Sequence, residues 1–104
     1  MNYFVLYITA GNQEEAGEIA KKLVEERLAA CANIIPRIES VYWWKGKVRN
    51  EKETLILAKT REGLVDRAIE RVKGIHSYDV PCVVALPIAG GNEDYLKWVE
   101  EETG

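Results

Sequence analysis

The stretch Tyr42-Trp43-Trp44-Lys45-Gly46-Lys47 carries two of the three tryptophans of the chain directly beside a turn signal. Lys45-Gly46 fits a tight turn because glycine takes positive φ without a steric penalty. Residues 32–41 before it and 48–59 after it are rich in β-branched and apolar side chains, which is typical of extended backbone. The sequence therefore predicts a long hairpin with aromatic side chains at its tip.

The aromatic tip predicts contact between copies of the chain. Each arm has roughly a dozen residues, about twice the ordinary strand length, and a chain of this size cannot cover so long a ribbon. Large exposed apolar patches usually mark interfaces. We therefore expect Tyr42, Trp43 and Trp44 to pack on another copy. The alternative is that both tryptophans fold back over their own core.

Length and charge limit the function classes. The 104 residues predict one domain, residues 1–104, with a real but thin core. The 14 basic and 17 acidic side chains give a formal net charge of −3, which argues against nucleic acid or an anionic membrane as the partner. No apolar run approaches the ~20 residues of a membrane span, and the chain leads directly into a strand without a signal peptide. The expected location is the cytoplasm.

The first third of the chain predicts a strand followed by a helix. Residues 3–9 form a β-branched and aromatic run that fits a central strand. Asn12 is the expected helix cap, with Glu15 in capping-box position. The following apolar residues recur at three-four spacing and predict one buried stripe. They are Ala16, Ile19, Ala20, Leu23, Val24 and Leu28.

The rest of the chain adds a bend, two helices and a strand. Pro36 cannot donate to a ladder and predicts an edge, a bulge or a bend in the first arm of the hairpin. A second helix is expected after Thr60, with Gly74 as a left-handed stop. Residues 82–88 predict a short apolar strand, and Gly90-Gly91-Asn92 is expected to end it and to cap a last helix. The apolar residues of that helix expected to return to the body are Tyr95, Leu96, Trp98 and Val99.

This order of elements predicts an α+β fold. Strand, helix, strand, strand, helix, strand is the βαββαβ order of the ferredoxin-like sandwich, in which one sheet carries both helices on a single face. Here the sandwich has a long hairpin between its second and third strands and an extra C-terminal helix. The face of the sheet opposite the helices is too apolar to stay in contact with water, so we expect the chain to self-associate through that face.

Five segments in this order resemble the CutA family, which is named for divalent-cation tolerance. The likeness covers nearly the whole chain. The matching segments are Arg27-Leu28-Ala29-Ala30-Cys31-Ala32-Asn33, Tyr42-Trp43-Trp44-Lys45-Gly46-Lys47, Lys59-Thr60, His76-Ser77-Tyr78-Asp79-Val80-Pro81 and Asp94-Tyr95-Leu96-Lys97-Trp98.

The resemblance implies a compact homotrimer in which the long hairpins pair between subunits, an assembly similar to that of the trimeric nitrogen-regulatory PII proteins. It also implies a role in tolerance to copper and other divalent ions, and some members of the family are described as copper-binding. No enzymatic reaction comes with it. We expect no tightly bound cofactor, and copper or another divalent cation is the candidate ligand.

The copper-site pattern of the family is incomplete here. Some members present a cysteine at the end of the first strand and a histidine pair before the Tyr-acid-Val-Pro loop, positions at which this chain has Ile8 and Ile75. Only His76 remains, and tight transition-metal sites need three or four donors. Three copies of His76 in a trimer, or His76 with Asp79, would supply more. The alternative is a loop histidine that orders its turn by hydrogen bonding.

The two cysteines, Cys31 and Cys82, are far apart in sequence and are expected to be reduced and buried. As a thiolate, Cys31 is a candidate ligand for Cu(I). The alternative for Cys31 is a structural, inert thiol, because burial raises thiol pKa values. Cys82 is expected to be structural only.

A cleft between subunits is the second candidate site. Lys59-Thr60 is expected to end the third strand and open a helix, where the helix terminus and Lys59 would bind a small anion. The alternative is a cap with an interfacial salt bridge. Tyr78, Tyr95 and Trp98 are the other expected cleft residues. A PII-like sensor or partner-docking protein with an anion in this cleft is the second functional hypothesis.

Two other classes share the predicted topology. An RNA-recognition module would need a basic surface and aromatic residues on its third strand, which residues 54–58 lack. An acylphosphatase-like enzyme would need an arginine in the loop after the first strand, and residues 9–12 contain none. The sequence disfavours both classes.

Overall fold

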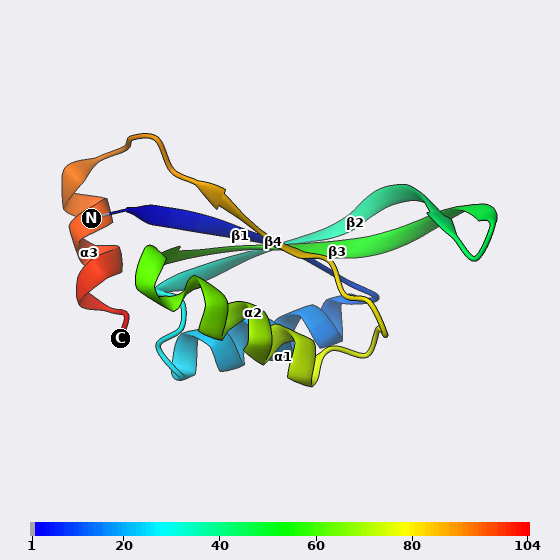
Figure 1. Ribbon diagram of the computed structural model, residues 1–104, viewed down its shortest axis with the longest axis horizontal. Helices are drawn as coiled ribbons and strands as arrows, with labels where there is room; N and C mark the ends of the chain where they lie inside the picture. The colour runs from blue at the N-terminus through cyan, green and yellow to red at the C-terminus, as the bar shows by residue number, and fades with distance from the viewer. Residues whose placement is uncertain (1) are drawn as a thin grey trace.

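A four-stranded antiparallel sheet with two helices on one face forms the body of the protein (Figure 1). The computed structural model describes residues 2–104. The strand order is β2-β3-β1-β4, which confirms the predicted ferredoxin-like arrangement. The elements are β1 (Tyr3–Ala10), α1 (Gln13–Glu25), β2 (Cys31–Trp44), β3 (Lys47–Arg61), the short 3-10 helix η1 (Glu62–Leu64), α2 (Val65–Ile75), β4 (Val83–Pro87) and α3 (Glu93–Glu101).

Helix α1 begins with the predicted cap. Asn12 Oδ1 accepts a hydrogen bond from Glu15 N at 2.8 Å, while Glu15 Oε1 accepts from Gly11 N at 3.3 Å, one residue before the cap. The predicted stripe is buried at its first four positions. Val24, however, is 38% exposed, because it lies at the edge of the stripe away from the sheet. Leu28 is buried but lies beyond the end of the helix.

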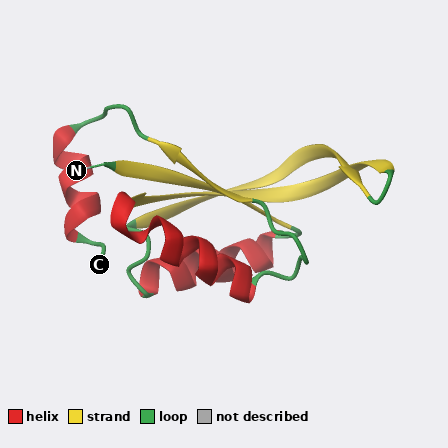
Figure 2. Cartoon of the chain, viewed as in Figure 1, coloured by secondary structure: helices red, strands yellow, loops and turns green. Residues whose placement is uncertain are grey.

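The core lies between the helices and one face of the sheet (Figure 2). Strand residues alternate, so every second side chain of β1 and β3 points to the helices. These side chains are completely or almost completely buried. They include Leu6, Ile8, Ile56 and Ala58.

The hairpin of β2 and β3 extends beyond the body and gives the chain its length of 44 Å (Figure 1). Lys45 (φ 50°) and Gly46 (φ 77°) form the predicted tight turn. The pairing register shifts between Ile35 and Ile38, which confirms the irregularity predicted at Pro36. Strand β2 is an edge strand, so the missing proline N–H costs no ladder bond inside the sheet.

Helix α2 differs from the prediction at both ends. Strand β3 continues through Thr60 to Arg61, and α2 begins at Val65 after η1. Gly74 is not a left-handed stop, because α2 continues to Ile75 and ends at the extended residue His76. The chain leaves the helix there because the ring of His76 is hydrogen-bonded to the Thr9 carbonyl of β1.

The last helix, α3, lies across one end of the sheet (Figure 1). Its predicted cap is present, with Asn92 Oδ1 accepting from Asp94 N at 3.0 Å. Val99 is fully buried, whereas Tyr95 and Trp98 are 39% and 40% exposed, so the apolar face of α3 returns to the body only in part. None of the helices between Asn2 and Gly104 combines the length and the apolar character needed to cross a membrane.

The sheet face opposite the helices carries apolar side chains that the single chain leaves open. Val84 and Leu86 of β4 are each 49% exposed, and Ile35 of β2 is 42% exposed. Farther out, Trp43 is 73% exposed, so it does not fold back over its own core.

Candidate functional site

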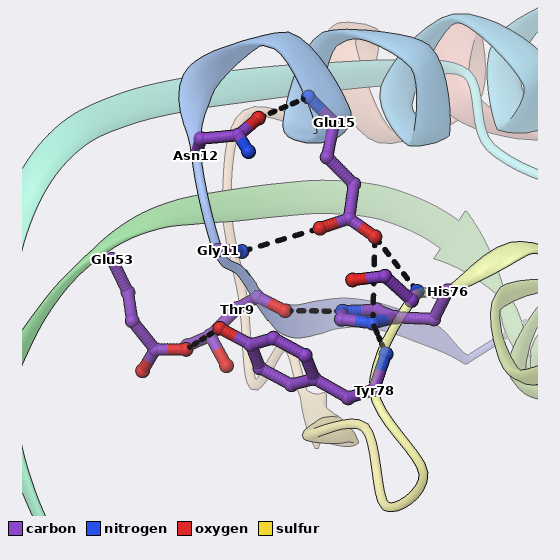
Figure 3. A network of polar contacts seen from close by, with 8 residues as sticks. Thr9, Gly11, Asn12, Glu15, Glu53, His76 and Tyr78 are labelled. Carbon is purple, nitrogen blue, oxygen red and sulfur yellow. Dashed lines mark hydrogen bonds and ion pairs between the residues drawn. The ribbon is translucent and has the colours of Figure 1, made fainter.

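His76 is buried with both ring nitrogens in hydrogen bonds (Figure 3). Its side chain is 0% exposed. Nε2 lies 2.7 Å from the carbonyl oxygen of Thr9 and donates to it, while Nδ1 accepts from the backbone N–H of Tyr78 at 3.0 Å. These partners fit a neutral ring with its proton on Nε2. In this arrangement no lone pair of His76 is free to bind a metal ion.

Glu15 supports the same loop from α1. Its Oε2 accepts from Ser77 N at 2.8 Å and lies 3.7 Å from His76 Nδ1. Burial alone would raise the pKa of Glu15, but the hydrogen bonds from Ser77 and Gly11 outweigh it and hold that pKa below its usual range. One ionised carboxylate therefore ties the start of α1 to the end of α2.

Tyr78 connects this network to the hairpin. Its hydroxyl donates to Glu53 Oε2 at 2.7 Å, and its ring lies 4.6 Å from that of His76 between centroids. Burial and the Glu53 carboxylate raise the pKa of Tyr78, so the hydroxyl remains a donor at neutral pH. Glu53 itself is only 8% exposed.

The three candidate metal ligands do not converge within one chain. Cys31 pairs with Lys59, which pairs in turn with Val5 of β1, whereas His76 bonds to Thr9. Val5 and Thr9 are four residues apart along β1, so Cys31 and His76 are separated by about 13 Å along the strand direction. Asp79 is exposed in the loop after His76. Among residues 2–104, no three His, Cys, Asp or Glu side chains are placed to hold one ion.

A second cluster lies at the other end of the sheet, where α3 meets β2. Cys31 Sγ is 3.1 Å from the Tyr95 hydroxyl, and the ring centroids of Tyr95 and Trp98 are 5.7 Å apart. The contact with Cys31 and burial raise the pKa of Tyr95 to about 12. Lys59 pairs with Cys31 across the strands and donates to Asn33. This end of the sheet thus holds three of the five predicted cleft residues.

The other two predicted cleft residues lie elsewhere. Tyr78 belongs to the His76 network at the opposite end of the sheet. Thr60 is 0% exposed, with its hydroxyl unpaired among the described residues, and it faces the helices rather than the open face. The predicted helix terminus beside Lys59 is also absent, because α2 begins only at Val65.

Both cysteines are free thiols. The expectation that both are buried was wrong, since Cys31 is half-buried and Cys82 is exposed. Cys82 lies just before β4, where the chain enters the edge of the sheet, and an edge position leaves it uncovered within one chain.

A groove of about 1130 Å³ runs along the hairpin to the loop after His76. The predicted interface residues Tyr42, Trp43 and Trp44 line its outer part. Tyr42 donates a hydrogen bond to Glu51 there, and this bond and burial raise the pKa of Tyr42. Glu53 and Tyr78 line the inner part. Aromatic and acidic side chains therefore face the same open space.

Sequence reasoning missed the roles of Glu15 and Glu53. Glu15 was assigned only to capping, although its second oxygen binds a residue 62 positions away. For Glu53 a signal existed, because period-two spacing places Glu51 and Glu53 on one face of a strand. That spacing did not reveal that Glu53 is buried, because its contact with Tyr78 comes from a loop 25 positions away in sequence.

Comparisons with known proteins agree over almost the full length. The family model of the CutA1 divalent ion tolerance protein matches residues 4–102. The divalent-cation tolerance protein CutA of Thermus thermophilus is 52% identical over 96% of this chain and 97% of its own length. The chloroplastic protein CutA 1 of Oryza sativa is 52% identical over 95% of this chain. The chain spans about half the length of the Oryza sativa and Arabidopsis thaliana relatives, 56% and 54%.

Solved structures show the same fold. The crystal structure of CutA1 from Oryza sativa matches with a TM-score of 0.96 and 50% identity, covering 100% of this chain and 95% of that one. The CutA1 structure from Thermus thermophilus matches with a TM-score of 0.95 and 51% identity, covering 98% of this chain and 99% of that one.

Proposed function

The chain belongs to the CutA1 divalent ion tolerance family, and from that premise we propose that it is a non-enzymatic homotrimer that binds copper and other divalent cations weakly. The observation that carries the proposal is the apolar surface that one chain leaves open. Trp43 at the hairpin tip is 73% exposed, and Val84 and Leu86 on the open sheet face are each 49% exposed. Large exposed apolar side chains at a hairpin tip and on an open sheet face are typical of interfaces.

The positions and partners of the candidate donors support weak rather than tight metal binding. His76 would have to give up a hydrogen bond to Thr9 or Tyr78 before it could bind a metal ion. Cys31 and Asp79, the other candidate ligands, belong to different ends of the sheet. A site assembled from several copies would therefore form at the cost of existing contacts.

The absence of an enzymatic step is supported by the partners of His76. A histidine that serves as a general base needs a nitrogen within reach of a nucleophile. Here both nitrogens bond to backbone groups of Thr9 and Tyr78. We place the protein in the cytoplasm as part of the same proposal.

The test combines assembly with ligand titration. Sedimentation equilibrium should give a particle of three chains of 11.8 kDa each. Isothermal titration with Cu(II) and Zn(II) should give weak binding with a small rise in melting temperature, because a ligand of the native state stabilises it. A monomer at all concentrations would overturn the assembly. A tight stoichiometric metal site would overturn the weak-binding part.

A PII-like sensor of small anions is the second candidate. Lys59, Cys31 and Tyr95 gather at one end of the sheet, where a cationic side chain lies among groups that donate hydrogen bonds. Such a set would suit a phosphate or carboxylate in a cleft between subunits. Nucleotides that raise the melting temperature of the wild-type protein, but not of a Lys59→Ala variant, would favour this function. No shift with any nucleotide would remove it.

A further inference from the structure

Arg27 occupies a backbone position that glycine usually takes. It follows Glu26, the C-cap of α1, and has a φ of 59°. Its N–H donates to the Val24 carbonyl at 3.0 Å, and the N–H of Leu28 donates to the Leu23 carbonyl at 2.9 Å. These two bonds form a Schellman motif, in which the left-handed residue is most often glycine. Because a β-carbon disfavours this conformation, the Arg27 side chain is expected to make a compensating contact.

That contact is with the end of α3. Arg27 Nη1 donates to Glu102 Oε2 at 3.0 Å and to the Glu102 carbonyl oxygen at 3.2 Å. The Arg27 carbonyl in turn accepts from Gly104 N at 3.1 Å. A second arginine acts beside it, since Arg61 Nε donates to Thr103 Oγ1 at 3.2 Å. Polar contacts with two arginines therefore hold the C-terminal end of α3 on the body.

Apolar packing holds α3 less firmly than it holds α1. Of the residues of α3, only Val99 is buried, and Val99 is not among the side chains of the core between the sheet and the other two helices. Helix α1, by contrast, places four buried side chains in that core. Helix α3 lies at the end of the sheet, outside the layer formed by α1 and α2 (Figure 1). Segments with few buried apolar contacts open at a lower free energy than the core does.

The segment before α3 has the properties of a hinge. The N–H of Ile88 donates to the Tyr3 carbonyl at 2.9 Å and fixes the chain to β1. In the part of the chain that the structure describes, no backbone hydrogen bond involves Ala89, Gly90 or Gly91. A β-carbon at Gly90 would have nothing within 4 Å, and a glycine backbone rotates with little steric restriction. The chain between β4 and α3 is therefore free to turn.

We propose that α3 is a strap that opens as a unit about this hinge while the sheet and the other two helices stay folded, and that Arg27 is the latch that keeps it closed. In the closed state the Tyr95 hydroxyl lies 3.1 Å from Cys31 Sγ. Opening therefore uncovers the Cys31 thiol and takes Tyr95 away from Cys31 and Lys59. The strap controls access to Cys31, and its opening requires neither a metal ion nor an anion.

Hydrogen exchange of the wild-type protein, read by mass spectrometry of its peptides, tests the opening. After correction for intrinsic rates, the amides of α3 should exchange at least about tenfold faster than those of α1. The rates should not change with protein concentration, because α3 opens within the assembled protein. Equal protection of α3 and α1 overturns the proposal. Exchange of α3 that rises on dilution also overturns it, since α3 would then open only after copies of the chain separate.

Arg27→Asn tests the latch. Asparagine tolerates the left-handed conformation but lacks the guanidinium group. Exchange of α3 should rise about three- to tenfold, with exchange of α1 unchanged. Arg37→Asn is the matched control, because Arg37 is also left-handed (φ 60°), is exposed and forms no ion pair within residues 2–104. An equal rise in both variants, no rise in Arg27→Asn, or an equal rise in α1 and α3 overturns the latch.

Thiol alkylation tests the control of access. In a Cys82→Ser background, Cys31 is the only thiol of the chain. Adding Arg27→Asn should speed the reaction of Cys31 with iodoacetamide by the same factor as it speeds the hydrogen exchange of α3. A Cys31 rate that does not follow the exchange of α3 would show that the thiol reacts while the strap is closed. That result would overturn the control of access to Cys31.

Discussion

Gly11 and Tyr78 lie so close that a β-carbon at position 11 would stand 3.3 Å from the Tyr78 hydroxyl oxygen and 3.5 Å from Cε1. The turn after β1 and the loop after α2 thus pack backbone against ring. Because the Tyr78 hydroxyl also binds Glu53, this approach helps to hold the inner end of the groove.

Gly11→Ala should therefore destabilise the protein by about 1 kcal/mol, since Tyr78 must shift and weaken its bond to Glu53. Urea denaturation at neutral pH measures the change. Gly17 is the matched control, because it lies inside α1 with nothing within 4 Å of an added β-carbon. Gly17→Ala should stabilise the protein by about 0.5–1 kcal/mol. Equal effects of the two substitutions would contradict the close approach.

Tyr78→Phe should cost about 1–3 kcal/mol, because it leaves the buried Glu53 carboxylate without its donor. Tyr7→Phe is the control, since no side-chain hydrogen bond within residues 2–104 uses the Tyr7 hydroxyl and the ring lines the same groove. Chemical denaturation of both variants gives the difference. A Tyr78→Phe variant as stable as the wild type would show that the hydroxyl contributes nothing to Glu53.

His76→Ala should lose about 2–4 kcal/mol of stability, because it removes a buried ring and leaves the Thr9 carbonyl and the Tyr78 N–H unpaired. Copper titration of the same variant should give the wild-type affinity, since neither nitrogen is free in the native structure. A drop in copper affinity with little loss of stability would instead make His76 a ligand that leaves its hydrogen bonds on binding.

The pH dependence of stability should reflect Glu15. Its folded pKa lies below the unfolded value of about 4.3, so its contribution is fully present above that value. The contribution is lost as pH falls through the folded pKa. Denaturation between pH 3 and 7 should therefore show a steeper acid loss in the wild type than in Glu15→Gln. If the two proteins lost stability equally as pH falls, folding would not favour the ionised form of Glu15.

Trp43→Ala tests whether the Trp43 ring is buried in an interface between copies or stays exposed to solvent. In an isolated chain, a side chain that is 73% exposed contributes less than about 0.5 kcal/mol. At the centre of an interface the same truncation costs about 2 kcal/mol or more and shifts the assembly toward monomers on dilution. We expect the second result in sedimentation velocity. An unchanged particle and melting curve would place the ring outside any interface.

The order of elements could be predicted because each depends on short-range patterns. The cap at Asn12, the turn at Lys45-Gly46 and the bulge at Pro36 are fixed by local backbone chemistry, and the structure has all three. The end of α2 was predicted wrongly at Gly74, because the ring of His76 is held by Thr9 across 67 positions of sequence. The predicted cleft residues do not all lie together for the same reason. Tyr78 lies beside His76 at the opposite end of the sheet from Lys59, Tyr95 and Trp98.

The sequence by itself determined the ferredoxin-like topology, the aromatic hairpin tip and the family, because periodicity and local motifs operate over a few residues. Only the tertiary structure decided that His76 has no free nitrogen and that Glu53 is buried beside the Tyr78 hydroxyl. Burial and hydrogen-bond partners depend on which distant segments meet. Here the loop after α2 meets the end of β1 and the base of the hairpin, and that meeting determines the chemistry of the groove.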